Sequence, residues 1–228
     1  MKKSRVLAYS FVLVISSCLF VGCMSPKSLA TSVKSVVFDD FKAIKPLNIG
    51  NIVLNTDGLQ KIDSAVAVER VRSYFIPAIF IWGWENTLKC QINDNYFVNV
   101  LVDEINRQND EFQFGKYLAD RHLEITIESV PSVFEYSDRG FYYFAFVAYG
   151  YSSYEGIQPD NQKFQVSYRI LDGEKELKKS VFTKYYNAPF RDQWLSGAPL
   201  ANKYVKEVTQ AYDEDCGHLV SGILDELY

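Results

Sequence analysis

Cysteine and histidine are the residues of this chain that could carry covalent or proton-transfer chemistry. The sequence contains four cysteines and two histidines. His218 follows Cys216 by two residues in a helical pattern, which would place their side chains about 200° apart around the helix. A Cys–His nucleophile pair needs its two groups to face each other within hydrogen-bond reach. We therefore predict structural roles for Cys216 and His218, and a surface position for His122 at the start of a strand.

Motifs of common catalytic and cofactor sites are missing from the sequence. It contains no CxxC, HExxH, P-loop or GxSxG pattern, so we predict no metal, no cofactor and no catalytic residue. Carboxylates that are scattered along a chain can still converge in space. The chain is predicted not to be an enzyme, and a hydrolase with a carboxylate-based site remains the alternative.

The N-terminus has the pattern of a secretory signal. Residues 1–5 carry three basic side chains, residues 6–21 are mostly apolar, and Gly22 and Cys23 follow. A basic segment, an apolar segment and a small residue before a break are typical of signal peptides. A transmembrane helix is the other interpretation, but this run is interrupted by serines and is shorter than the roughly 20 residues that a bilayer span needs.

The end of this signal, residues 20–23 (FVGC), resembles the lipobox of bacterial lipoproteins. The resemblance implies that Cys23 becomes the first mature residue and carries acyl chains, which would anchor the protein firmly. The sequence departs from the usual pattern at Phe20, where leucine is common. It predicts a signal peptide at 1–22, a lipid anchor and tether at 23–46, and a single domain at 47–228.

Charge and location follow from this division. The signal takes three basic residues with it, which leaves 21 basic and 28 acidic residues and a net charge of −7 in the mature chain. This balance argues against nucleic acid as a partner and against electrostatic adhesion to anionic lipid. Met24 and Ser25 follow the cysteine without an Asp, which in proteobacterial lipoproteins favours the outer membrane over the inner. We expect the domain to face the periplasm, and Cys90 and Cys216 to be either a disulfide or two buried thiols.

Hydrophobic periodicity predicts two helices and several strands. One helix spans about 94–108, capped by Asn93 or Asp94, and a long helix runs from about 199 to the C-terminus. Period-2 alternation predicts strands near 123–127 and 164–170, an edge strand at 176–186 after an Asp172-Gly173 turn, and a first strand near 47–55. The expected fold is α+β: a mixed, mainly antiparallel sheet of four to five strands, with both helices packed on one face.

Aromatic residues gather in two places. Residues 74–84 form an aromatic insertion that either covers the second face of the sheet or stays exposed as a docking surface. Residues 137–140 are expected to form a turn into a strand over 141–151, which is apolar on both faces. Trp82, Trp84, Tyr149 and Tyr151 are the candidate partner-binding residues, because Trp and Tyr dominate such contacts.

The combination of elements resembles the accessory lipoproteins of bacterial ABC-type and lipid-transport systems. The segments that carry this resemblance are the Gly22-Cys23 pair, the strands at 52–54, 123–127 and 166–171, the helix at 96–105, and the terminal helix. It implies a non-enzymatic, membrane-tethered component that binds an envelope protein or lipid. The alternatives are an envelope hydrolase and a surface-exposed adhesion lipoprotein.

Replacing Cys23 tests the lipoprotein interpretation. Cys23→Ala removes the only thiol at the signal junction, so the variant should take up no acyl probe during metabolic labelling, whereas the wild-type chain should be labelled. Equal labelling of both proteins would rule out Cys23 as the acyl acceptor.

Overall fold

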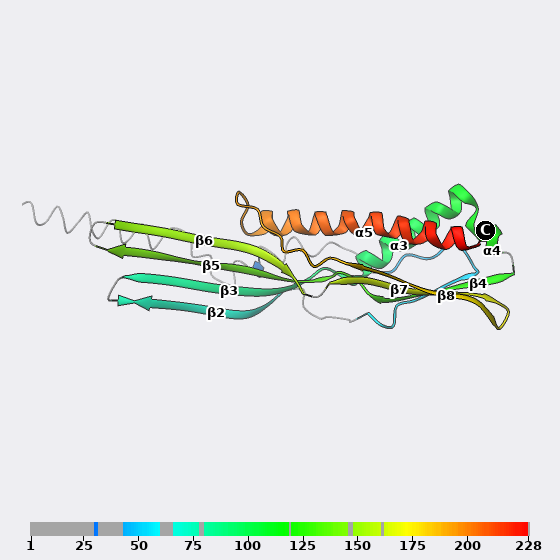
Figure 1. The fold of residues 1–228 in the computed structure, drawn as a ribbon, viewed down its shortest axis with the longest axis horizontal. Coiled ribbons are helices and arrows are strands. Elements are labelled where there is room, and N and C mark those ends of the chain that lie inside the picture. The colour runs from blue at the N-terminus through cyan, green and yellow to red at the C-terminus, as the bar shows by residue number, and fades with distance from the viewer. Residues whose placement is uncertain are drawn as a thin grey trace, which may run out of the picture.

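The structure, a computed structural model, describes residues 30–31, 43–59, 66–77, 80–118, 120–145, 148–160 and 162–227. Its elements form an elongated molecule with two sheets (Figure 1). In chain order they are β1 (Ile52–Asn55), β2 (Val66–Ile76), β3 (Ile81–Gln91), α3 (Asp94–Phe112), α4 (Phe114–Leu118), β4 (Arg121–Ser129), β5 (Val133–Ala145), β6 (Ala148–Pro159), β7 (Lys163–Asp172), β8 (Lys175–Tyr185) and α5 (Ala198–Leu227).

The first sheet has the strand order β1-β4-β7-β8, with β1 parallel to β4 and the other pairs antiparallel. Alternation in β4 buries Leu123, Ile125 and Ile127 and turns the residues between them outward. The outer face is polar and includes an ion pair between Arg169 and Glu124. The predicted edge strand is confirmed as β8, after a turn in which Gly173 has φ 59°.

Helices α3 and α5 pack on the buried face of this sheet, as the sequence predicted. Asn93 caps α3 by accepting a hydrogen bond from the backbone N–H of Asn95, and the helix continues four residues further than the periodicity indicated. Three aromatic rings join the layers: Tyr212 of α5 lies 4.8 Å from Phe97 of α3 and 4.5 Å from Phe164 of β7, measured between ring centroids. These contacts form the centre of the hydrophobic core.

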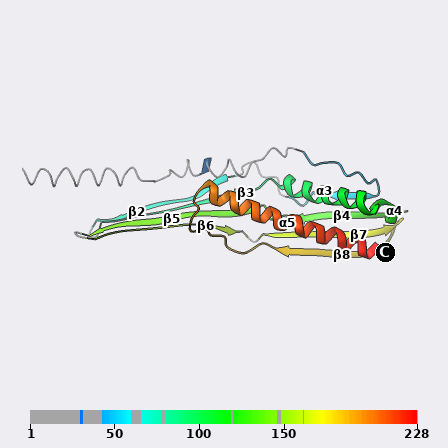
Figure 2. The same cartoon turned by 90° about the horizontal axis from the view of Figure 1, so that it is seen from above.

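The second sheet is antiparallel, with the order β2-β3-β5-β6. Two long hairpins lie side by side, and their far ends extend beyond the N-terminal end of α5 (Figures 1 and 2). We call this four-stranded sheet the blade. The prediction of a single sheet of four to five strands is therefore wrong: the described residues form eight strands in two four-stranded sheets.

Two local predictions in the blade are also wrong. Residues 74–76 and 81–84 are not an insertion over the first sheet, because they lie in the paired strands β2 and β3. Residues 137–140 are not a turn: they lie inside β5 and pair with both β3 and β6. The predicted strand 141–151 instead spans the end of β5 and the start of β6, which are successive strands of one hairpin.

Cys90 and Cys216 do not form a disulfide. Cys90 in β3 and Cys216 in α5 are both free and buried. The sequence left a disulfide and two buried thiols open, and the structure has the two thiols.

Leu219→Ala tests the docking of α5 on the core. Leu219 is 3% exposed, so truncating it should lower the free energy of unfolding by about 2–5 kcal/mol. Gln210→Ala, at an exposed position of the same helix, should change it by less than about 0.5 kcal/mol. Chemical denaturation followed by circular dichroism measures both, and equal effects would show that α5 is not part of the core.

Candidate functional site

The cysteines and histidines do not form a reactive site in the described part of the chain. Cys216 is buried while His218 is exposed on the same helix, and His122 is exposed as well. Burial raises the pKa of the Cys90 thiol to about 12, which keeps it protonated and unreactive near neutral pH. Among the described residues, no group of three His, Cys, Asp or Glu side chains could hold a metal ion.

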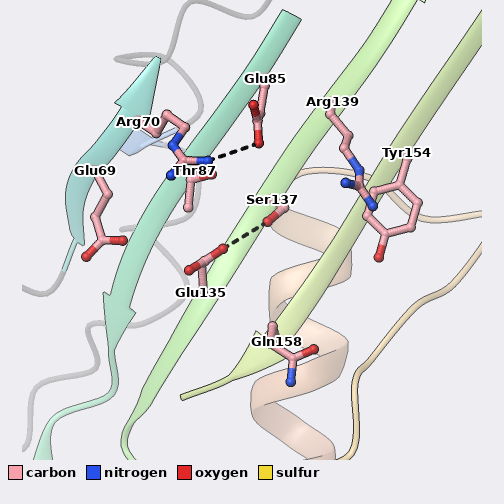
Figure 3. A pocket seen from close by; sticks show the side chains of 9 residues that line it. All are labelled: Glu69, Arg70, Glu85, Thr87, Glu135, Ser137, Arg139, Tyr154 and Gln158. Atoms are coloured by element: carbon pink, nitrogen blue, oxygen red, sulfur yellow. Dashed lines mark hydrogen bonds and ion pairs between the residues drawn. The ribbon is translucent and has the colours of Figure 1, made fainter. Parts of the chain in front are cut away.

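One face of the blade has an open hollow lined by polar side chains (Figure 3). Two of its three glutamates have partners within it: Glu85 pairs with Arg70 at 3.4 Å, and Glu135 accepts a hydrogen bond from Ser137 at 3.3 Å. Arg139 lies 4.4 Å from the ring centroid of Tyr154. Four of the five charged side chains that line the hollow therefore have a contact within it, so we do not place the binding function there.

The opposite face of the blade carries a cluster of aromatic rings. Trp82 and Trp84 of β3, Tyr142 of β5 and Tyr151 of β6 form this aromatic cluster. Tyr142 is central, with its ring centroid 6.0 Å from Trp82, 5.3 Å from Trp84 and 4.9 Å from Tyr151. The four residues come from three adjacent strands, so the cluster exists only in the folded sheet.

The aromatic cluster begins where α5 no longer covers this face of the blade. Phe134, on the same face of β5, packs against Tyr204 of α5 with 4.9 Å between ring centroids. Alternation along β5 then places Tyr136, Asp138, Gly140 and Tyr142 on this face. Tyr136 is fully buried, whereas Tyr142 is only partly buried. The same sheet face therefore changes from covered core to accessible surface within a few residues.

Asp138 fixes the inner edge of the cluster. Its carboxylate accepts a hydrogen bond from the Trp84 indole Nε1 at 2.9 Å and another from Asn86 Nδ2 at 3.1 Å. An indole N–H that is removed from water needs a partner. This pair of hydrogen bonds explains why an acidic residue stands within a strand at the border of an aromatic surface.

Glycines in the blade accommodate aromatic rings from neighbouring strands. Tyr74 lies opposite Gly83, Trp84 opposite Gly140, and Tyr143 opposite Gly150. In each pair, a Cβ on the glycine would collide with the aromatic ring. Contact between an aromatic ring and a glycine of the next strand stabilises the pairing of the two strands where no helix packs on the sheet.

The far end of the blade has no charged side chain. We call the described residues 73–77, 80–84, 140–145 and 148–154 the tip; no Asp, Glu, Lys, Arg or His occurs anywhere in the sequence from 73 to 84 or from 140 to 154. Large apolar side chains of the tip are exposed on both faces of the sheet, and they are Tyr74, Phe75, Ile76, Phe80, Phe141, Tyr143, Phe144, Tyr149 and Tyr151. Monomeric soluble proteins rarely expose so much contiguous apolar surface unless it has a binding role.

The four residues proposed from the sequence lie together on one face of the blade. Trp82, Trp84 and Tyr151 belong to the aromatic cluster, and Tyr149 lies beyond it near the start of β6, 84% exposed. Sequence reasoning missed Tyr142, Phe75 and Phe144 on this face. The signal that could have found them is the absence of charge over two separate segments. Cys23 lies outside the described residues.

Comparison with protein-family models, with curated proteins and with solved structures finds no match to this chain. Within the described residues, no helix is long and apolar enough to cross a membrane.

Gly140→Ala tests the role of the glycines in the blade. The new Cβ would meet the Trp84 ring and come within 2.6 Å of the Ser152 carbonyl oxygen. We expect a loss of about 1–3 kcal/mol in the free energy of unfolding, together with a changed near-ultraviolet circular dichroism signal from the displaced indole.

Gly222→Ala is the control for this substitution. A Cβ at Gly222, which is exposed on α5, would meet nothing within 4 Å. The helix should then gain about 0.5–1 kcal/mol, because alanine loses less backbone entropy than glycine. A Gly140→Ala protein as stable as wild type would contradict close packing of Trp84 on Gly140.

Proposed function

We propose that this chain is a membrane-tethered lipoprotein of the bacterial cell envelope that acts as a non-enzymatic binding or assembly component. Lipid on Cys23 holds it at the membrane, and the exposed aromatic end of the blade binds an envelope partner. The observation that carries the proposal is the tip, which presents exposed aromatic side chains without a single charge.

The arrangement of the aromatic side chains supports binding. Tyr and Trp combine a large apolar body with a polar group, and they dominate the contact energy of many interfaces. Asp138 and the facing glycines hold the rings in fixed positions, so little conformational entropy would be lost on contact. A surface prepared in this way is suited to a partner that covers it.

The more specific version is an accessory subunit of an envelope transport system. It rests on the resemblance of residues 47–228 to the accessory lipoproteins of ABC-type and lipid-transport systems, and on the anchor. We place the protein at the outer membrane, facing the periplasm, in accordance with the residues that follow Cys23.

Site-specific photo-cross-linking in intact cells tests this function. A photoreactive amino acid at Tyr149, which is 84% exposed in the tip, should form adducts with an envelope component. The same amino acid at Glu176, exposed near the start of β8 in the other sheet, is the matched control and should form few. Equal adducts at both positions, or adducts at Glu176 alone, would refute binding through the blade.

A further inference from the structure

Charged residues form a row across the blade immediately before the tip begins. Arg72 of β2 lies opposite Glu85 of β3, and Glu85 lies opposite Arg139 of β5. On β6 the residue opposite Arg139 is Tyr154, and Glu155 follows it. From this row to the hairpin turns, all four strands are uncharged. The boundary between charged and uncharged surface therefore lies at one level on every strand, perpendicular to the strands.

Both faces of the tip are apolar. Phe75 and Tyr149 are exposed on the face of the aromatic cluster, at 58% and 84%, and Tyr74 and Tyr143 are exposed on the other face, at 50% and 39%. A groove in a protein partner would cover one face of a sheet and leave the other in water. A medium that surrounds the tip on all sides would remove both faces from water, and the apolar part of a lipid bilayer is such a medium.

The first described residue, Ala30, lies against the domain, which limits how far a lipid on Cys23 could hold the domain from a membrane. Ala30 packs against the hydrophobic core, and it follows Cys23 by seven residues. Seven residues extend to about 25 Å at most. A lipid on Cys23 would therefore keep the domain near the bilayer surface, where the tip can meet the same membrane.

Strand edges limit how deeply the tip can enter. β2 and β6 are the outer strands of the blade, so their outward backbone N–H and C=O groups need partners, which hydrocarbon cannot supply. Pro77, at the first turn, is five positions beyond Arg72, which corresponds to about 17 Å of extended strand. That length spans the headgroups and part of one leaflet, since a full crossing needs about 9–11 residues per strand.

From these observations we propose that the tip of the blade inserts into the interfacial layer of a lipid bilayer, and that this bilayer is the one that holds the Cys23 anchor. The inference rests on the proposed function and names its partner as lipid. The charged row lies at the level of the headgroups, and the aromatic side chains lie just below it, where Trp and Tyr are enriched in membrane proteins. The mature chain has a net charge of −7, so apolar contact and not charge attraction drives insertion.

Fluorescence quenching in vesicles tests the insertion. The mature acylated protein is reconstituted into phosphatidylethanolamine–phosphatidylglycerol vesicles whose acyl chains carry bromine, a contact quencher of tryptophan. The chain has three tryptophans. A Trp194→Phe variant keeps only Trp82 and Trp84 in the blade, and its fluorescence should be quenched. A variant with both Trp82→Phe and Trp84→Phe keeps only Trp194, which is 84% exposed and lines a hollow with Ser153 and Glu155 at the level of the charged row. Its fluorescence should be quenched much less, because this level lies outside the acyl chains.

Two matched tyrosine substitutions locate the contact. In the Trp194→Phe background, Tyr149→Asp places a charge in the tip and should reduce the quenching severalfold. Tyr185→Asp is the control, because Tyr185 is 63% exposed at the end of β8 in the other sheet, and it should leave the quenching unchanged. Raising the salt from roughly 0.1 M to 1 M should also leave it unchanged, because salt screens charge attraction and not apolar contact.

Three results would overturn the inference. They are unquenched Trp82 and Trp84 in the anchored protein, equal effects of the two tyrosine substitutions, and cross-links at Tyr149 that join copies of the chain instead of reaching lipid. The anchor is tested separately. Acylation of Cys23 without quenching would contradict insertion and leave the tether intact. Equal acyl labelling of the wild-type and Cys23→Ala chains, together with quenching of Trp82 and Trp84, would contradict the Cys23 tether and support insertion.

Discussion

The start of α5 determines where the protein has a covered core and where it has an exposed blade. The backbone N–H of Gly197 lies 2.7 Å from Glu155 Oε2 and 2.8 Å from the Tyr136 hydroxyl, and Tyr136 in turn donates to Glu155. These bonds attach the beginning of the helix to the middle of the second sheet. They also place a carboxylate at the N-terminal end of the helix, where the helix dipole favours negative charge. From this point α5 runs away from the tip, over the first sheet, so nothing that it carries can cover the aromatic cluster.

The elements predicted from the sequence are those whose pattern reflects one buried and one exposed face. α3, α5, β4 and β7 each pack one face on the common core, so their apolar residues follow a period that can be read locally. The blade has no such period, because its tip is apolar on both faces. The segment Ser137-Asp138-Arg139-Gly140 has the composition of a turn. It forms a strand because Asp138 binds Trp84 and Asn86 and because Gly140 leaves space for the Trp84 ring. Those partners are more than 50 residues away, beyond the range of any local pattern.

The candidate site was predictable in its residue types but not in its assembly. Aromatic content identified Trp82, Trp84, Tyr149 and Tyr151, and strand register explains why they share a face. Tyr142 connects Trp82, Trp84 and Tyr151, yet nothing in the local sequence distinguishes it from Tyr143, its neighbour on the opposite face. The state of the thiols could not be predicted locally either. Whether Cys90 and Cys216 form a disulfide depends on the positions of β3 and α5, and in the structure both are free and buried. Register and packing, which depend on residues far apart in the chain, supply what composition cannot.

Apolar side chains on both sides of a sheet create two physical problems, one of strand register and one of aggregation. Without a core on either side, cross-strand contacts alone must keep the strands in register, and exposed aromatic surface favours aggregation. The three aromatic–glycine pairs address the first problem, since each ring packs on the backbone of the next strand and the series runs from β2 through β3 and β5 to β6. The row formed by Arg72, Glu85 and Arg139 addresses the second problem, because it ends the apolar surface at one level instead of letting it continue onto the body of the protein. The aromatic–glycine pairs restrict the motion of the strands in the tip, and the charged row limits the length of the apolar surface. Rigidity lowers the entropy lost on contact, and confinement restricts contact to a medium or partner that can receive the end of the blade.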